Sequence, residues 1–284
     1  MLDREEHIEQ AYFFRSLGQR LVDNIPMQEV LGSVKEEILA TTKLPMAIDY
    51  MLAELLHAGM VSTAMAKLPH YFTQFQTYVM HEAESERGRF DFRVALVILE
   101  REAQYRAEGK TPQGMFMYQF ETLCRNRLRY DRGLDAMAQD PIYDEPWRVW
   151  ITNVRRQVGL VDLADLIFVR SEHSLVVRRR QGESDPQSDK PLLFGEREGK
   201  IALANRKKDP LLLFAALQRQ LGYPEVPRVT PVDDTPQLIP QLMRRMERLE
   251  TRLKMMEEEQ RSGSSDLTKF YQRDDPPAAG LGEG

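Results

Sequence analysis

The sequence predicts an all-α protein: a multi-helix globular domain, then a Pro-rich spacer, a short C-terminal coiled coil and a disordered tail. Three observations predict this class. Apolar residues recur every three to four positions through most of the N-terminal part, which is the spacing of a helix with one buried face. Prolines and capping residues interrupt this pattern at short intervals, as they do at helix starts. Alternating, strand-like runs are scarce by comparison.

Residues 1–181 are expected to form a helical domain of about seven to ten helices. The apolar stripes that predict them run over 8–21, 30–38, 48–56, 72–79, 94–105, 116–123 and 147–158. Phe13 and Phe14 point to different sides of the first helix, which predicts that this helix is packed on two sides. The segment 160–177 is expected to be one buried helix, although 166–169 could also be a strand.

The start of two helices is predicted from local capping signals. Thr111-Pro112 and Asp209-Pro210 each combine a capping side chain with a proline at the first helical position. The stripe that contains Trp147 and Trp150 is among the cleanest in the chain, so both indoles are expected in the core.

The C-terminal part divides by composition into five segments. Residues 182–190 are polar and are expected to be an exposed loop or linker. Residues 191–223 are expected to form a two-helix appendage, and 224–236 a Pro-rich spacer that is extended and partly stiff. A coiled coil is expected over 237–260, and 261–284 are expected to be disordered because they hold few apolar residues.

The heptad in the coiled-coil segment is the most specific signal in the sequence. Apolar residues alternate between a and d positions in the order Ile239, Leu242, Met246, Leu249, Leu253 and Met256. In a parallel homodimer Arg245 would face Glu250 of the other chain, and Arg252 would face Glu257, so both contacts would be attractive. The run is under three heptads, so docking on another protein, packing on its own domain and a solvated single helix remain alternatives.

One spacing suggests metal chemistry. Glu54 and His57 form a Glu-x-x-His pair on one helical face, which is half of the motif found in carboxylate-bridged di-metal bundles. His81 and Glu84 could complete the ligand set from a neighbouring helix, but the sequence holds no second copy of the motif. A single pair of this kind arises often by chance, so an exposed side-chain pair is favoured, and no cofactor is predicted.

Signals for catalysis are weak. Cys124 is the only cysteine, and it stands beside an apolar stripe, which favours a buried thiol over a nucleophile activated by nearby arginines. No phosphate-binding glycine loop, nucleophile elbow or metalloprotease pattern is present. In the tail, Leu267, Phe270 and Tyr271 have the spacing of a short docking helix.

The charge balance disfavours general nucleic-acid binding. Lys and Arg number 39 against 44 Asp and Glu, so the net charge is −5, whereas phosphate binding needs a cationic surplus. Basic residues do cluster at 125–132, 178–180 and 206–208. Solvated helix ends explain such clusters, and a cationic patch would require the fold to bring them together.

Taken together, these patterns favour a cytoplasmic, non-enzymatic adaptor or scaffold that self-associates as a parallel homodimer and binds an unknown protein partner. No apolar run approaches the roughly 18 residues that span a bilayer, and the acidic N-terminus resembles no targeting peptide, so no membrane association is expected. A metal-binding helical bundle or enzyme that uses the Glu-x-x-His face is one alternative. A nucleic-acid-associated regulator that uses the arginine clusters is the other.

Overall fold

The computed structural model describes residues 2–21, 25–85, 90–109, 111–181 and 190–228, together with Met246 and Leu253. The chain divides into two units, unit 1 from Met1–Val229 and unit 2 from Thr230–Gly284. Within the described residues the protein is all-α, as the sequence predicts: it has thirteen helices and no β-strand. One isolated bridge joins Ser171 and Phe194.

Seven helices make up the first part of unit 1. They are α1 (Arg4–Arg20), α2 (Met27–Glu37), α3 (Leu44–Ala58), α4 (Val61–Ala66), α5 (Gln74–Glu84), α6 (Phe92–Ala107) and α7 (Pro112–Arg125). Six more follow. They are α8 (Tyr130–Ala138), α9 (Glu145–Gln157), α10 (Leu163–Val169), α11 (Glu172–Arg180), α12 (Glu196–Ala204) and α13 (Pro210–Leu221).

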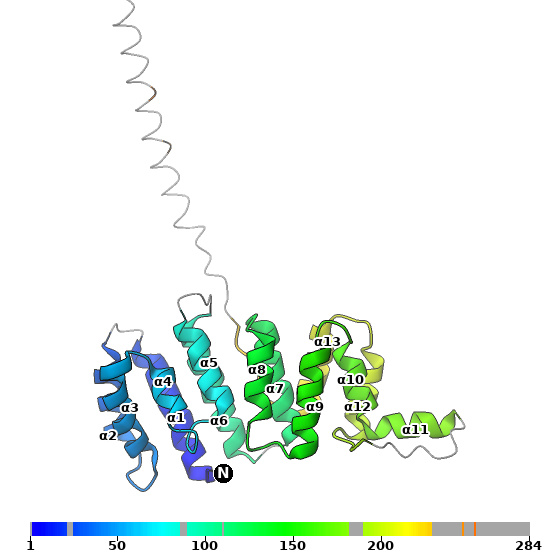
Figure 1. The fold of residues 1–284 in the computed structure, drawn as a ribbon, viewed down its shortest axis with the longest axis horizontal. Coiled ribbons are helices and arrows are strands. Elements are labelled where there is room, and N and C mark those ends of the chain that lie inside the picture. The colour runs from blue at the N-terminus through cyan, green and yellow to red at the C-terminus, as the bar shows by residue number, and fades with distance from the viewer. Residues whose placement is uncertain are drawn as a thin grey trace, which may run out of the picture. The chain divides into compact units, whose positions relative to one another are not determined.

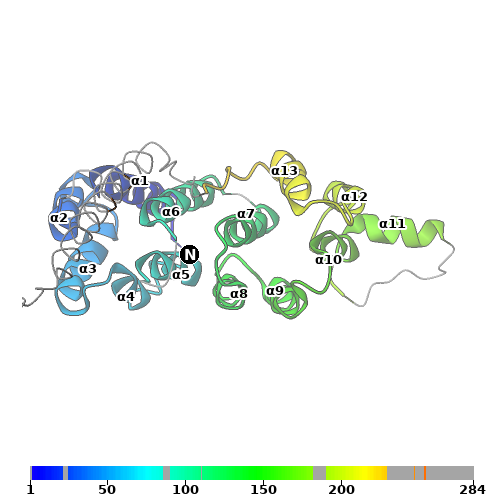
Figure 2. The same ribbon diagram turned by 90° about the horizontal axis from the view of Figure 1, so that it is seen from above.

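The helices of unit 1 lie in two rows (Figures 1 and 2). Seen from above, α1, α6, α7, α13 and α12 form one row, and α3, α4, α5, α8 and α9 form the other. α1 packs along α6, and α8 packs along α9. The N-terminal end of α1 lies between the rows, near α5 and α6 (Figure 2).

Local capping explains where several helices begin. The Thr111 hydroxyl accepts from the Gly114 amide and the Asp209 carboxylate accepts from the Leu211 amide, so both predicted helix starts are confirmed. Thr73 and Gln76 form a reciprocal capping box at the start of α5. Such caps satisfy amides that have no partner inside the helix, and they fix where each helix meets the next segment.

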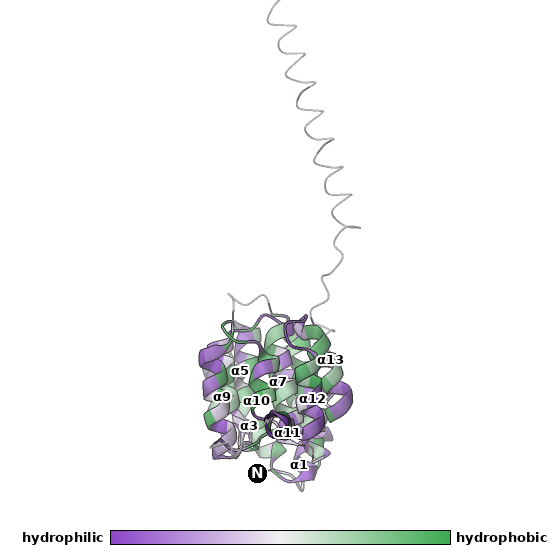
Figure 3. Ribbon diagram, turned by 90° about the vertical axis from the view of Figure 1, so that its right-hand side faces the viewer, coloured by the Kyte–Doolittle hydropathy of each residue, from purple (hydrophilic) through white to green (hydrophobic). Residues whose placement is uncertain are grey.

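Aromatic side chains fill the space between the rows. Phe13 and Phe14 are both fully buried, so α1 is packed on two sides as expected. Trp147 and Trp150 are 4% and 3% exposed, which confirms their expected burial, and the Trp150 ring centroid lies 4.6 Å from that of Phe116. In Figure 3 α13 is mainly hydrophobic, whereas α9 is hydrophilic along much of its length because only one face of it enters the core.

Two details of the expected helix pattern are wrong. Residues 160–177 form two helices, because α10 ends at Val169 and the Glu172 amide donates to the Phe194 carbonyl (3.0 Å) at the start of α11. The described parts of residues 1–181 contain eleven helices, slightly more than the expected seven to ten, since several of these helices are only six to nine residues long.

The start of the predicted spacer packs on unit 1. Val226 is 3% exposed, the Asn126 side chain donates to the Pro227 carbonyl (3.0 Å), and Arg101 donates to the Glu225 carbonyl. The rest of the spacer, the coiled coil except Met246 and Leu253, and the tail lie outside the described residues. In the described part of the chain, no helix has the length and apolar content needed to cross a bilayer.

Candidate functional site

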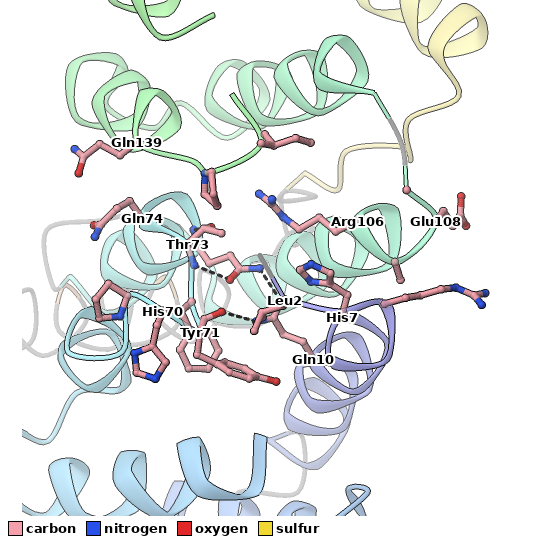
Figure 4. A pocket seen from close by; sticks show the side chains of 18 residues that line it. Leu2, His7, Gln10, His70, Tyr71, Thr73, Gln74, Arg106, Glu108 and Gln139 are labelled. Atoms are coloured by element: carbon pink, nitrogen blue, oxygen red, sulfur yellow. Dashed lines mark hydrogen bonds between the residues drawn. The ribbon is translucent and has the colours of Figure 1, made fainter. Parts of the chain in front are cut away.

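A cleft of about 1210 Å³ opens where four helix ends of unit 1 meet (Figure 4). Its walls come from the start of α1, the segment 69–76 that leads into α5, the end of α6, and the segment 139–142 between α8 and α9. His70, Glu108 and Gln139 are exposed lining residues, so the cleft is open to solvent. Its shape is therefore set by four segments that are far apart in sequence.

A buried ion cluster of Glu102, Arg106 and Asp140 lies at one wall of the cleft. The Arg106 Nη1 donates to Asp140 Oδ1 (3.1 Å), its Nη2 donates to Glu102 Oε1 (2.8 Å), and Nη2 also pairs with Asp140 Oδ2. The Arg106 side chain is 5% exposed and both carboxylates are fully buried. Burial acts to lower the pKa of Arg106, but Asp140 and Glu102 outweigh it and raise that pKa, so the guanidinium stays charged and neutralised.

Gln119 and Tyr143 extend this cluster into the core. The Gln119 amide donates to Glu102 (2.9 Å) and to Asp140 (3.0 Å), while its carbonyl oxygen accepts from the Tyr143 hydroxyl (2.8 Å). The cluster thereby ties α6, α7 and the segment after α8 together. It positions Arg106, the one member that lines the cleft.

His7 lines the cleft from α1 and is uncharged at neutral pH. Burial, with a smaller contribution from the nearby Arg106 charge, lowers the pKa of His7 to about 4. Among the described residues, His7 Nδ1 and Arg106 Nε are buried atoms without a hydrogen-bond partner. Both atoms belong to residues that line the cleft.

Amide side chains connect the α1 wall to the α5 wall. Gln76 Nε2 donates to Gln10 Oε1 (2.9 Å), and Gln10 Nε2 donates to the Tyr71 carbonyl (3.4 Å). Burial raises the pKa of the Tyr71 hydroxyl, with a further contribution from Glu6, so Tyr71 stays protonated. This wall therefore presents uncharged polar groups.

The four candidate metal residues, for which ordinary side-chain contacts were the favoured interpretation, are engaged in such contacts or exposed. Glu54 forms an ion pair with Lys67, and Glu84 accepts from the Val61 and Ser62 amides at the start of α4 (2.6 and 2.8 Å). His57 and His81 are exposed. Within the described ranges, no group of three or more His, Cys, Asp or Glu side chains is arranged to hold a metal ion.

Cys124 is a poor nucleophile in this fold. Burial raises the pKa of its thiol to about 11, which outweighs the opposite effects of a hydrogen bond from Tyr130 and of Arg125. Cys124 is only partly buried, but its raised pKa is consistent with the favoured interpretation of an unreactive thiol.

The basic clusters are partly neutralised by local partners. Arg125 pairs with Glu121, and Arg129 lies 3.1 Å from Glu82. Arg206 pairs with Asp165 (2.5 Å) and lies over the Phe168 ring, 4.3 Å from its centroid. These arginines therefore stabilise helix packing.

Two of the predicted oligomerisation residues are described. Met246 and Leu253 are helical and are 60% and 56% exposed. The other predicted oligomerisation residues, and the tail residues proposed as a docking motif, lie outside the described residues. They are Ile239, Leu242, Arg245, Leu249, Glu250, Arg252, Met256, Glu257, Leu267, Phe270 and Tyr271.

The cleft was not predicted from the sequence, although one signal for it exists. Along α6, the buried Ile98 is followed at intervals of four residues by Glu102 and Arg106. The two charged side chains therefore lie on the same helical face as a core residue. Charges on a core-facing stripe indicate a buried ion pair. The partner Asp140 is 34 residues away, and no spacing rule connects it to this pair.

No family model matches this chain, and neither the curated proteins nor the solved structures contain a match to it.

Proposed function

We propose that this protein is a non-enzymatic, cytoplasmic adaptor. In this proposal unit 1 binds a protein partner through the cleft, and the heptad of unit 2 joins two chains as a parallel homodimer. The two functions reside in different units of the chain, because the heptad begins after Val229.

The observation that carries the proposal is the chemistry of the cleft. Its buried polar groups can donate or accept hydrogen bonds, but they are poorly suited to proton transfer near neutral pH. Burial lowers the pKa of His7 to about 4, and it raises that of Tyr71. A site with such groups favours binding over acid–base catalysis.

Self-association is supported by two residues of the heptad. Met246 and Leu253 are one heptad apart, are both helical and expose large apolar side chains in the single chain. A second chain would bury such side chains, at about 25 cal/mol for each Å² of apolar surface removed from water.

Sedimentation of the full chain tests the dimer. Leu249→Glu with Leu253→Glu places charges at a and d positions, so the measured mass is expected to halve while the helical signal of unit 1 persists. The matched control is Arg244→Glu with Thr251→Glu, because both residues stand at outer f positions of the same heptads and should leave the dimer intact. A wild-type chain that is already monomeric at tens of micromolar would contradict the proposal.

Charge reversal tests the parallel orientation. Changing Arg245 and Arg252 to Glu should weaken the dimer, because each would face Glu250 or Glu257 of the other chain. Changing those two glutamates to Arg in the same protein should restore it. A failure to restore the dimer would exclude the parallel register.

A further inference from the structure

We infer that the cleft binds an extended, uncharged peptide segment of the partner protein, held by hydrogen bonds to its backbone and by an apolar side chain. The inference rests on the proposed adaptor function and names the chemistry of its partner. Three properties of the cleft lead to it: its size, its charge balance and its hydrogen-bonding groups.

The size of the cleft exceeds that of an ordinary small-molecule site. Its volume is about 1210 Å³, whereas pockets for drug-sized ligands hold about 300–1,000 Å³. Exposed residues such as His70 and Gln139 line it, so a ligand can continue beyond the cleft into solvent. A polypeptide segment satisfies both conditions, because only part of it needs to lie inside.

The charge balance of the cleft disfavours an anionic ligand. Arg106 is the buried cation of the lining, and two carboxylates already neutralise it. His7 is uncharged at neutral pH because burial lowers its pKa to about 4. At the exposed rim the charges of Arg4 and Glu108 have opposite sign. A buried anion would lose hydration without gaining an uncompensated counter-charge.

The polar atoms of the cleft match a peptide backbone. Arg106 Nε is an obligate donor, and no described residue accepts from it, so it suits a peptide carbonyl. His7 Nδ1 is likewise buried without a partner in the described chain. Gln74 and Gln139, which both line the cleft and are labelled in Figure 4, carry amide groups that can both donate to and accept from a peptide unit.

An apolar patch gives the segment an anchor. Leu2 and Ile142 line the cleft and are only partly buried, so they present apolar surface to it, while Phe72 behind them belongs to the hydrophobic core. Side chains alternate along an extended segment, so one apolar residue can contact this patch while its neighbours point to solvent. Main-chain hydrogen bonds then supply affinity, and the anchored side chain supplies specificity.

Peptide selection on the full-length protein tests the inference. Phage-displayed random peptides of about twelve residues are selected on the wild-type chain, and the enriched sequences are synthesised with acetylated and amidated ends. Their affinities are then measured by fluorescence anisotropy for wild type, for Gln74→Ala with Gln139→Ala, and for a control. The control is Gln28→Ala with Gln104→Ala, which removes two exposed amides outside the cleft.

The expected result is binding about tenfold weaker for the cleft variant and changed less than about twofold for the control, since two hydrogen-bonding side chains are lost only in the first. Enriched peptides should carry an apolar residue and little charge, and their affinity should change little between about 50 and 500 mM salt. Equal melting temperatures of the two variants would show that the cleft variant is folded.

Three results would overturn the inference. They are the enrichment of no peptide, equal binding to both variants, and acidic peptides whose affinity falls steeply with salt. The sedimentation test separates these results from a failure of the proposed function. A chain that dimerises through its heptad but selects no peptide loses the cleft inference alone.

Discussion

Replacing Arg106 with Met should destabilise unit 1 strongly. The change keeps much of the aliphatic volume but removes the only cation of the buried ion cluster. Glu102 and Asp140 are fully buried, so their carboxylates would then face each other's charge without a guanidinium between them. Breaking a buried ion pair by removing one partner costs about 3–5 kcal/mol, mainly because the remaining charge stays buried.

A matched substitution makes this prediction specific to charge. The cluster holds two carboxylates and one guanidinium, so Glu102→Gln removes its excess negative charge. The new amide oxygen can still accept from Arg106 Nη2, which lies 2.8 Å from Glu102 Oε1. We therefore expect Glu102→Gln to change the free energy of unfolding by no more than about 1 kcal/mol, because hydrogen bonding is retained and the charges balance.

Urea unfolding followed by tryptophan fluorescence measures both variants, because Trp147 and Trp150 are buried in unit 1. The slope of the unfolding free energy against urea should stay constant while the midpoint shifts. The reasoning would be refuted if Arg106→Met lay within about 1 kcal/mol of wild type, or if Glu102→Gln cost as much as Arg106→Met.

Three further predictions concern single side chains. The pKa of His7 is lowered from 6.5 to about 4, so the unfolded chain takes up a proton at a higher pH than the folded chain does. The free energy of unfolding should therefore fall by about 1–2 kcal/mol as the pH drops from 6.5 towards 4, once partial solvent exposure is allowed for. His7→Gln should flatten this pH dependence in urea titrations. Trp150→Ala should cost about 3–5 kcal/mol, whereas Val149→Ala on the exposed side of α9 should change stability by less than about 0.5 kcal/mol; equal melting temperatures would contradict the packing. Because burial raises the thiol pKa to about 11, Cys124 should react with a thiol reagent at pH 8 far more slowly in the native chain than in urea, and equal rates would show that it is accessible.

Features that depend on neighbours within one or two turns were predictable. The Thr111 cap reaches Gly114, and the Asp209 cap reaches Leu211, so both helix starts follow from adjacent residues. Burial of Trp147 and Trp150 follows from their shared helical face. These predictions succeed because the interacting atoms are close in sequence.

Features that depend on contacts between distant segments were not predictable from the sequence. The apolar pattern of residues 160–177 predicts one helix, but the structure has a break before α11. Backbone contacts with Phe194 lie at this break, and no local sequence signal indicates them. The Glu-x-x-His spacing of Glu54 and His57 is visible in the sequence, but in the structure Glu54 forms an ion pair with Lys67. Spacing places two side chains on one face, but it does not determine what faces them.

The sequence by itself determined that this protein is all-α, where several helices begin and which indoles are buried, because helical periodicity and capping act over a few residues. Only the tertiary structure decided that the ends of α1, α5, α6 and α8 enclose a cleft. It alone also decided that Asp140 neutralises Arg106 and that His7 loses its charge there. Burial and electrostatics depend on which distant segments come together, and that outcome belongs to the packing of the whole unit.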